Sequence, residues 1–144
     1  VAGSINVAEI HGNRTLLRCM RCHWRVPREE FEVVEMPPRC PQCGGVIKGD
    51  GVMFGEPIPP DVLNTCFRET DRCDCMIVLG TSGTVYPAAG FPVQAHRHGA
   101  YLIEINTEPT PITEIVDVSL RGPTGDLLPL LVTRVRELVA DRAT

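Results

Sequence analysis

The chain has 144 residues, which is enough for one ordinary domain with a hydrophobic core. Hydrophobic residues make up 43% and charged residues 22%, and the formal net charge of −4 lacks the basic excess that is typical of a nucleic-acid-binding protein. No apolar run approaches the roughly 20 residues that a membrane-spanning helix needs.

The cysteine count is high, at 7 residues, and four of these cysteines form two Cys-x-x-Cys pairs. Paired spacing and an odd total favour metal binding over a disulfide framework. Because free thiols persist in reducing compartments, we expect a cytoplasmic location.

The first predicted element is a short strand over residues 5–10, which ends at His11 and Gly12. A glycine at this point leaves room for a substrate to approach. An imidazole near its unperturbed pKa is suited to proton transfer at neutral pH. A lone histidine is more often a structural residue, so the residues alone leave both roles open for His11.

The segment from about residue 13 to residue 60 contains both cysteine pairs and has little helical periodicity. It is too poor in apolar residues to be stable by burial alone, so we expect a metal to stabilise it. Four thiolates on two tight knuckles can meet at one tetrahedral point. The sequence therefore predicts a structural zinc site with these ligands: Cys19, Cys22, Cys40 and Cys43.

Two alternatives remain for this metal site. The second knuckle, residues 40–44, is also typical of an iron-binding rubredoxin, which would make the module an electron carrier. His23 follows Cys22 directly and could compete as a ligand, although four cysteines already fill the coordination shell.

Residues 52–56, Val-Met-Phe-Gly-Glu, form an apolar stretch that a glycine interrupts. Such a stretch could be a buried strand. It could equally be an edge that accepts an extended peptide by strand addition.

Residues 61–144 alternate predicted helices with predicted strands. We expect helices over residues 61–70, 87–97 and 124–140, and strands over residues 75–79, 101–105 and 115–120. The continuous apolar run at 75–79 is typical of a strand that is buried on both faces. This alternation indicates a parallel α/β sheet, with Cys66, Cys73 and Cys75 as core residues.

Ligands of parallel sheets bind beyond the carboxyl ends of the strands. Residues 80–83, Gly-Thr-Ser-Gly, and residues 106–108, Asn-Thr-Glu, follow two predicted strands, so we expect both turns and His11 along one edge. The small residues let the backbone approach a ligand, and the polar ones could bond a ribose. Steric needs and solvation explain such turns equally well.

An ordered set of motifs spans nearly the whole chain: Glu9-Ile10-His11-Gly12, the two cysteine knuckles, Phe54-Gly55-Glu56, residues 80–90, residues 105–111 and residues 121–125. In this order the motifs resemble those of the sirtuins, the family of NAD-dependent protein deacylases. The run from Phe54 to Leu131 most resembles the class that contains lysine desuccinylases and desmalonylases.

The resemblance implies a role for each of these residues. His11 would be the catalytic base, and the four knuckle cysteines would hold structural zinc. The residues implied to contact NAD are Gly80, Thr81, Ser82, Asn106, Thr107, Glu108 and Thr124. The residues implied to bind the acyl-lysine peptide or protein substrate are Val52, Phe54, Gly55 and Glu56.

The fold implied by the resemblance is an α/β fold, namely the C-terminal part of a parallel, Rossmann-like NAD-binding sheet with an inserted small zinc-ribbon module. Residues 1–12 would form a strand and the catalytic loop, residues 13–50 the zinc module, and residues 51–144 the C-terminal half of the NAD-binding domain. The enzyme would transfer the acyl group from lysine to ADP-ribose and release nicotinamide.

The family's N-terminal half carries a GAGxS stretch and a TQNID-type segment, and neither occurs here. We therefore expect that these 144 residues alone do not turn over NAD and that the N-terminal half is a required partner. The alternative, of a different class, is a non-catalytic zinc-ribbon interaction module on an α/β support. We expect no direct contact with nucleic acid or a membrane.

Overall fold

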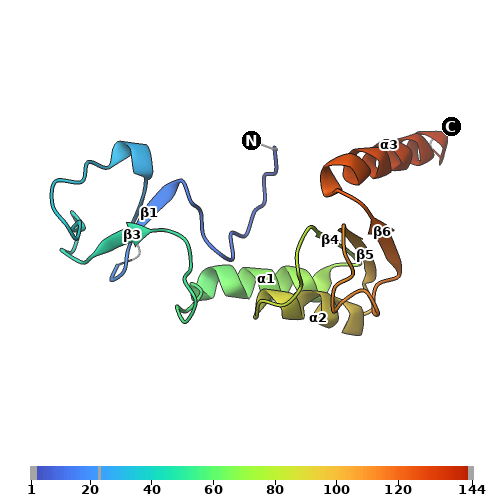
Figure 1. The fold of residues 1–144 in the computed structure, drawn as a ribbon, viewed down its shortest axis with the longest axis horizontal. Coiled ribbons are helices and arrows are strands. Elements are labelled where there is room, and N and C mark those ends of the chain that lie inside the picture. Colours follow the sequence, from blue (N-terminus) through green and yellow to red (C-terminus); the bar gives the residue numbers. More distant parts are fainter. Residues whose placement is uncertain (1–2, 23, 143–144) are drawn as a thin grey trace. The chain divides into compact units, whose positions relative to one another are not determined.

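The computed structural model describes residues 3–22 and 24–142, and the chain divides into two compact units, residues 1–64 and 65–144. Figure 1 shows the helices and strands. His23, the predicted competing ligand, lies outside the described residues. Among the residues described, none of the helices combines the length and the apolar composition of a membrane span.

The first unit contains a small antiparallel sheet whose strands occur in the order β2-β1-β3. The central strand β1 pairs with both neighbours, which aligns Leu17 with Val26 and Cys19 with Ile47. A short 3-10 helix, η1, follows β2 directly. The bounds of these elements are β1 (Leu16–Cys19), β2 (Arg25–Pro27), η1 (Arg28–Glu30) and β3 (Ile47–Gly49).

The hydrophobic core of this unit is small. Its buried members are Leu17, Cys19, Cys40 and Ile47, and two of these four are predicted metal ligands. Trp24 packs edge-on against Phe31, with ring centroids 5.9 Å apart. A core of this size supplies little burial energy, which agrees with the predicted need for a metal staple.

The strand predicted over residues 5–10 does not form. The segment is irregular and ends in a turn, in which the Gly12 amide donates to the Glu9 carbonyl at 2.8 Å. Ile5 is 94% exposed. A strand requires a partner for its backbone hydrogen bonds, and none of the described strands pairs with this segment, so apolar content alone was a misleading signal.

Residues 52–56 do not form a strand either, so the buried-strand interpretation is wrong. The Glu56 amide donates to the Met53 carbonyl at 2.9 Å and closes a turn. Gly55 adopts φ +80°, a conformation that glycine reaches without steric cost. Phe54 at the turn is 94% exposed.

The second unit contains a parallel sheet, as predicted, and its strand order is β4-β5-β6 (Figure 1). The helix α1 enters it from the first unit, and its start and end agree with the sequence prediction within two residues. The elements are α1 (Pro60–Arg72), β4 (Cys75–Leu79), η2 (Ala88–Gly90), α2 (Phe91–Arg97), β5 (Tyr101–Asn106), β6 (Val118–Arg121) and α3 (Thr124–Arg142).

The core of the second unit lies between α2 and β5. Ala95 and Leu102 are fully buried there, and Met76 and Cys73 pack against them. Phe67 of α1 meets Phe91 of α2 edge-on, with ring centroids 5.3 Å apart. Aliphatic and aromatic packing of this kind stabilises the unit by burial of apolar surface.

Two elements begin at residues other than those predicted. The helix expected from residue 87 starts as the 3-10 turn η2, because Pro92 has no N–H to donate to the Ala88 carbonyl. The strand expected from residue 115 starts at Val118. Ile115 instead closes a turn onto Ile112, and its side chain packs against the core.

The prediction that β4 is buried on both faces is wrong for this chain. Alternate residues are open to solvent, with Ile77 42% and Leu79 38% exposed. The core prediction for Cys75 is also wrong, since this residue is exposed on the same strand. Side chains alternate along a strand, so within these residues one face of β4 meets the core and the other is open. Cys73 does pack against the core, and Cys66 is half-buried.

Candidate functional site

Four cysteine sulfurs gather at one point in the first unit. Cys19 and Cys22 come from the end of β1 and the turn after it, and Cys40 and Cys43 come from the turn before β3. All four ligand atoms lie within 4.8 Å of one another. The Sγ atoms of Cys19 and Cys43 are 3.5 Å apart, and those of Cys22 and Cys40 are 3.6 Å apart.

Backbone amides shape the two knuckles. The Arg21 amide donates to the Cys19 sulfur at 3.3 Å, and the Gln42 amide donates to the Cys40 sulfur at 3.4 Å. Gly45 lies so close that a Cβ there would be 2.9 Å from the Cys19 sulfur. Gly45 is thus a site residue that the cysteine spacing did not indicate, although a glycine just after a knuckle is a usable signal.

Contacts within the cluster shift the pKa of Cys19 and of Cys22 in opposite directions. A hydrogen bond from the Cys22 backbone, assisted by Arg21 and Cys43, outweighs desolvation and lowers the pKa of Cys19 to about 6. For Cys22 a backbone hydrogen bond at Trp24 acts to lower the pKa, but desolvation and the neighbouring sulfurs outweigh it and raise the pKa to about 12. Cys19 therefore ionises more readily than an ordinary thiol, and Cys22 ionises less readily. Four sulfurs at this spacing fit structural zinc.

His11 lies outside this cluster. Its side chain is exposed, in the turn that follows Glu9, and its backbone carbonyl accepts a hydrogen bond from the Val52 amide at 3.0 Å. The structure therefore keeps His11 and the metal ligands as two separate groups within the first unit.

Gly12 has a packing role that the sequence did not reveal. Its φ is +76°, and a Cβ at this position would lie only 2.2 Å from the carbonyl oxygen of Asp50. The sequence suggested that Gly12 leaves space for a substrate. In the structure the atom that needs this space belongs to the chain's own backbone.

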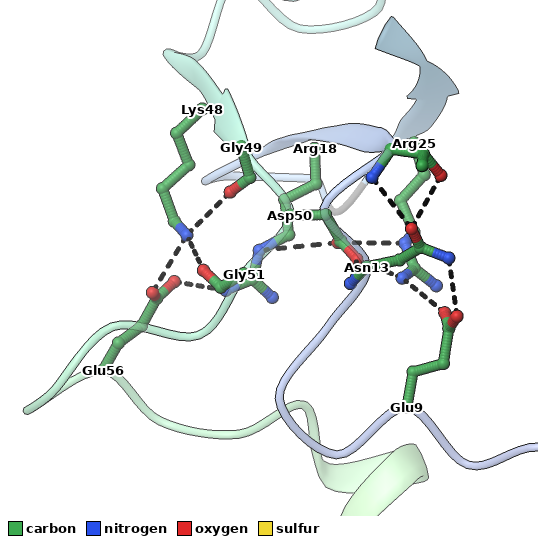
Figure 2. Close-up of polar contacts among 10 residues, drawn as sticks. Glu9, Asn13, Arg18, Arg25, Lys48, Gly49, Asp50, Gly51 and Glu56 are labelled. Carbon is green, nitrogen blue, oxygen red and sulfur yellow. Dashed lines mark hydrogen bonds and ion pairs between the residues drawn. The ribbon is translucent and has the colours of Figure 1, made fainter. Parts of the chain in front are cut away.

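A network of charged side chains surrounds Asp50, which is 2% exposed (Figure 2). Its carboxylate accepts hydrogen bonds from Nε of Arg25 at 3.0 Å and from a terminal nitrogen of Arg25. It also accepts one from the backbone N–H of Asn13 at 2.8 Å. Arg18 lies beside it, with Nε 3.9 Å from the carboxylate. No motif marked these residues, because their partners are distant in sequence.

Glu56, a predicted substrate-binding residue, makes ion pairs within the first unit. It pairs with Arg18 and with Lys48, whose Nζ lies 3.0 Å away. Burial acts to raise the pKa of Glu56, but the Met53 backbone hydrogen bond and these two cations outweigh it and lower the pKa. The carboxylate therefore stays ionised and anchors the turn that presents Phe54.

In the second unit, the ends of β4 and β5 lie together as the parallel sheet predicts. The Gly80 amide donates to the Ile105 carbonyl at 3.0 Å, and Asn106 Nδ2 donates to the Thr81 carbonyl at 2.7 Å. The Thr124 hydroxyl, at the start of α3, is 3.4 Å from the same Ile105 carbonyl. The structure thus brings four of the seven predicted NAD-contacting residues to one edge of the sheet.

The remaining three of these residues lie in the two turns at this edge. The Ser82 hydroxyl is 2.8 Å from the Thr84 hydroxyl, and the Thr107 amide donates to Asn106 Oδ1 at 2.9 Å. The Glu108 carbonyl accepts a hydrogen bond from Arg121 at 2.7 Å. The expectation that His11 shares this edge stays a prediction.

A second buried carboxylate, Glu104, organises the loop beyond this edge. It is 1% exposed and accepts hydrogen bonds from Thr113 at 2.8 Å, from Arg121 at 3.0 Å, from Ser119 at 3.1 Å and from Thr110. Burial acts to raise the pKa of Glu104, but these hydrogen bonds and the Arg121 charge outweigh it and lower the pKa. Sequence reasoning missed Glu104 because it lies within an apolar strand.

Comparison with known sequences finds relatives that belong to one family. The Sir2 family model matches residues 1–87. The NAD-dependent protein deacylase of Thermococcus kodakarensis is 42% identical over 147 aligned residues, which cover 98% of this chain and 57% of that protein. NAD-dependent protein deacylase 1 of Archaeoglobus fulgidus is 42% identical, with coverages of 96% and 57%. The chain thus spans a little over half the length of these curated relatives.

Solved structures give the same result. A Sir2 homologue mutant in complex with ADP-ribose matches with a TM-score of 0.86 and 40% identity, over 96% of this chain and 55% of that one. A Sir2 homologue–NAD complex matches with a TM-score of 0.85 and 41% identity, over 94% and 53%. A Sir2–p53 peptide–NAD⁺ complex matches with a TM-score of 0.78 and 31% identity, over 92% and 56%.

Proposed function

Because this chain belongs to the Sir2 family, we propose that the protein containing it is an NAD-dependent protein-lysine deacylase. The observation that carries this proposal is the 42% identity, over 98% of the chain, to a protein of that name. The four-cysteine cluster and the polar edge of the parallel sheet both support it.

The edge formed by Gly80, Thr81, Asn106 and Thr124 is the proposed NAD contact of this chain. Support comes from the Sir2 homologues of similar fold whose structures contain NAD or ADP-ribose. Ser82, Thr107 and Glu108 lie in the turns at this edge and complete the proposed set. Hydroxyl, amide and carboxylate groups at strand ends are suited to bonding ribose hydroxyls.

The four-cysteine cluster is the proposed structural zinc site. Cys19, Cys22, Cys40 and Cys43 would hold the ion, which would join the two knuckles around the small core of the first unit. Four sulfur ligands leave no coordination position open, so the ion stabilises the fold and takes no part in the reaction. A red, redox-active preparation would instead support the rubredoxin-like alternative.

His11 is the proposed general base. With NAD bound, the reaction would release nicotinamide and transfer the acyl group from lysine to ADP-ribose. His11 would accept a proton from a ribose hydroxyl, because a neutral imidazole can do so near neutral pH. The exposed side chain of His11 and its separation from the metal cluster are consistent with this role.

The turn at residues 52–56 is the proposed contact for the acyl-lysine peptide. Phe54 and Met53 are 94% and 66% exposed, which leaves apolar surface available for a substrate. The Sir2–p53 peptide–NAD⁺ complex supports a peptide as the partner. Val52 and Gly55 would shape the backbone of this contact, and Glu56 would contribute by anchoring the turn through Arg18 and Lys48.

The remaining proposals concern the whole protein. We propose that these 144 residues do not turn over NAD by themselves, because the curated relatives are nearly twice as long. The division into a catalytic loop at 1–12, a zinc module at 13–50 and a nucleotide-binding part at 51–144 stays a prediction. A cytoplasmic location is proposed from the cysteine content alone.

The direct test is a deacylation assay of the full-length protein with NAD and an acyl-lysine peptide. We expect wild-type protein to release nicotinamide and free lysine, and His11→Ala to lose at least about 100-fold in kcat. His96→Ala, at an exposed histidine on α2, is the matched control and should retain activity. A zinc-loaded wild-type protein with no NAD-dependent turnover would overturn the proposal in favour of a zinc-ribbon interaction module.

A further inference from the structure

We propose that Asp50 is a positioning residue that connects the metal-binding module to the loop carrying His11. The inference rests on the proposed function of His11, but its structural content can be measured separately. The central observation is a buried carboxylate that binds the His11 loop on one side and the sheet of the module on the other (Figure 2).

The segment 50–52 contacts three consecutive residues, 11–13, of the His11 loop, which comprises residues 9–13. The Val52 amide donates to the His11 carbonyl at 3.0 Å. The Asp50 carbonyl oxygen packs so closely against Gly12 that a Cβ there would approach to 2.2 Å. The Asp50 carboxylate accepts a hydrogen bond from the backbone N–H of Asn13 at 2.8 Å. The backbone from the His11 carbonyl to Asn13, on the C-terminal side of the His11 side chain, is therefore fixed by one short segment.

Asp50 is itself fixed by the module. It follows β3 directly, and β3 pairs with β1 so that Ile47 aligns with the metal-ligand residue Cys19. Both oxygens of the carboxylate bind Arg25 of β2. Two forked hydrogen bonds from one guanidinium define the position and the plane of a carboxylate more strictly than a single bond does.

Arg25 also reaches the loop from the other side. One of its nitrogens lies 3.5 Å from the Glu9 carboxylate, and Asn13 Nδ2 donates to the same Glu9 at 2.6 Å. The loop is thus enclosed by Glu9 and Asn13 at its two ends, and both contact the Arg25–Asp50 pair. This closed arrangement restricts the backbone that carries His11.

The charge on Asp50 is essential to this arrangement. A carboxylate offers acceptor sites to Arg25 and Asn13 together, whereas an amide replaces one oxygen with a donor that would face a guanidinium. Proton transfer depends strongly on geometry, and a displacement of about 1 Å can reduce a rate about 100-fold. Asp50→Asn should therefore release the loop while adding almost no volume change.

The test compares Asp50→Asn with Glu30→Gln in the full-length protein. Glu30 is an exposed acid of the same module, so both variants replace one carboxylate by its amide. For Asp50→Asn we expect amide exchange of residues 9–13 to accelerate at least about tenfold, with bound zinc and exchange within β1 unchanged. We expect kcat to fall at least about tenfold and the peptide KM to stay within about twofold. Glu30→Gln should match wild type.

The proposal would be overturned if amide exchange at residues 9–13 were as slow in Asp50→Asn as in wild type. Equal acceleration of exchange throughout the module would also overturn it, because that result indicates a merely structural role. If Asp50→Asn fails to fold, Arg25→Gln is the second variant, because Arg25 is half exposed and should be replaced at lower cost. It should give the same local acceleration with a smaller fall in kcat, and unchanged loop exchange there contradicts the proposal. A wild-type protein without deacylase activity refutes the proposed function, while the exchange comparison still decides the role of Asp50.

Discussion

The two units of this chain achieve order by different means. The first has a core of four buried residues, two of which are cysteines of the metal cluster. The second packs aliphatic side chains between a helix and a parallel sheet. Yet among the described residues each unit contains one nearly inaccessible carboxylate, Asp50 in the first and Glu104 in the second. Asp50 contacts the His11 loop directly, whereas Glu104 binds Arg121, which also donates to the Glu108 carbonyl. A buried charge is thus linked to the proposed site in each unit, although the two units are stabilised differently.

The largest effect is expected from loss of the metal, which should unfold the first unit and leave the second unit folded. Cys40→Ser removes a buried ligand, so the first unit should lose its zinc and its amide protection over residues 16–50. The sheet of the second unit should stay protected at residues 101–106, because its core contains no ligand. Metal analysis with hydrogen exchange measures both, and Cys66→Ser is the control outside the cluster. Collapse of both units together would contradict the division.

Glu104→Gln tests the buried charge of the second unit. Four hydrogen-bond donors surround this carboxylate, and Arg121 would lose its anionic partner, so we expect the free energy of unfolding to fall by about 3 kcal/mol. Chemical denaturation measures this change. Glu114→Gln, at an exposed residue of the following loop, should cost less than about 0.5 kcal/mol. Equal effects would show that the network adds no stability.

The same variant predicts a dependence on pH. The pKa of Glu104 is lowered in the fold, so its stabilising contribution is complete above the ordinary glutamate pKa and is lost as pH falls through the lowered value. The stability difference between wild type and Glu104→Gln should therefore be constant near neutrality and shrink below about pH 4. Denaturation curves over a pH series check this. A difference that grows on acidification would reverse the assigned sign.

Gly12→Ala tests the close backbone contact between Gly12 and Asp50 in the first unit. The added Cβ meets both a positive φ and the Asp50 carbonyl, so we expect a loss of about 2 kcal/mol. Gly55→Ala shares the positive φ but has no atom within 4 Å of the added Cβ, so it should cost about 1 kcal/mol. Thermal unfolding of both variants isolates the contact. Equal losses would mean that the neighbouring backbone gives way easily.

The smallest effect is expected on the surface of α3. Arg134 and Glu137 form an exposed pair at 2.9 Å, and such pairs contribute about 0.3 kcal/mol. Glu137→Gln should therefore change the free energy of unfolding by no more than this, with the difference vanishing in high salt. A loss above about 1 kcal/mol would show that α3 is sensitive to surface charge.

Local patterns in the sequence predicted much of this structure. The spacing of the four cysteines identified the metal cluster, a continuous apolar run identified β4, and local sequence also indicated α1, β5 and α3. These features depend on residues that are neighbours in sequence or on ligand chemistry. The predicted end of the second helix at residue 97 is confirmed, and Gly99, with φ +87°, follows it.

The features that were missed depend on distant partners. Asp50 binds Asn13 from 37 positions away and Arg25 from 25 positions away, and Glu104 binds Arg121 from 17 positions away. No local pattern reveals such pairs. The strand expected at residues 5–10 failed for a related reason, since a strand needs a partner that local composition cannot supply.

The separation of metal and histidine is the central claim, and X-ray absorption at the zinc edge tests it most directly. The full-length protein and its His11→Ala variant should give the same spectrum, with four sulfur ligands at about 2.3 Å and no nitrogen ligand. A nitrogen shell in the wild type that disappears in His11→Ala would place the histidine on the metal and contradict the account.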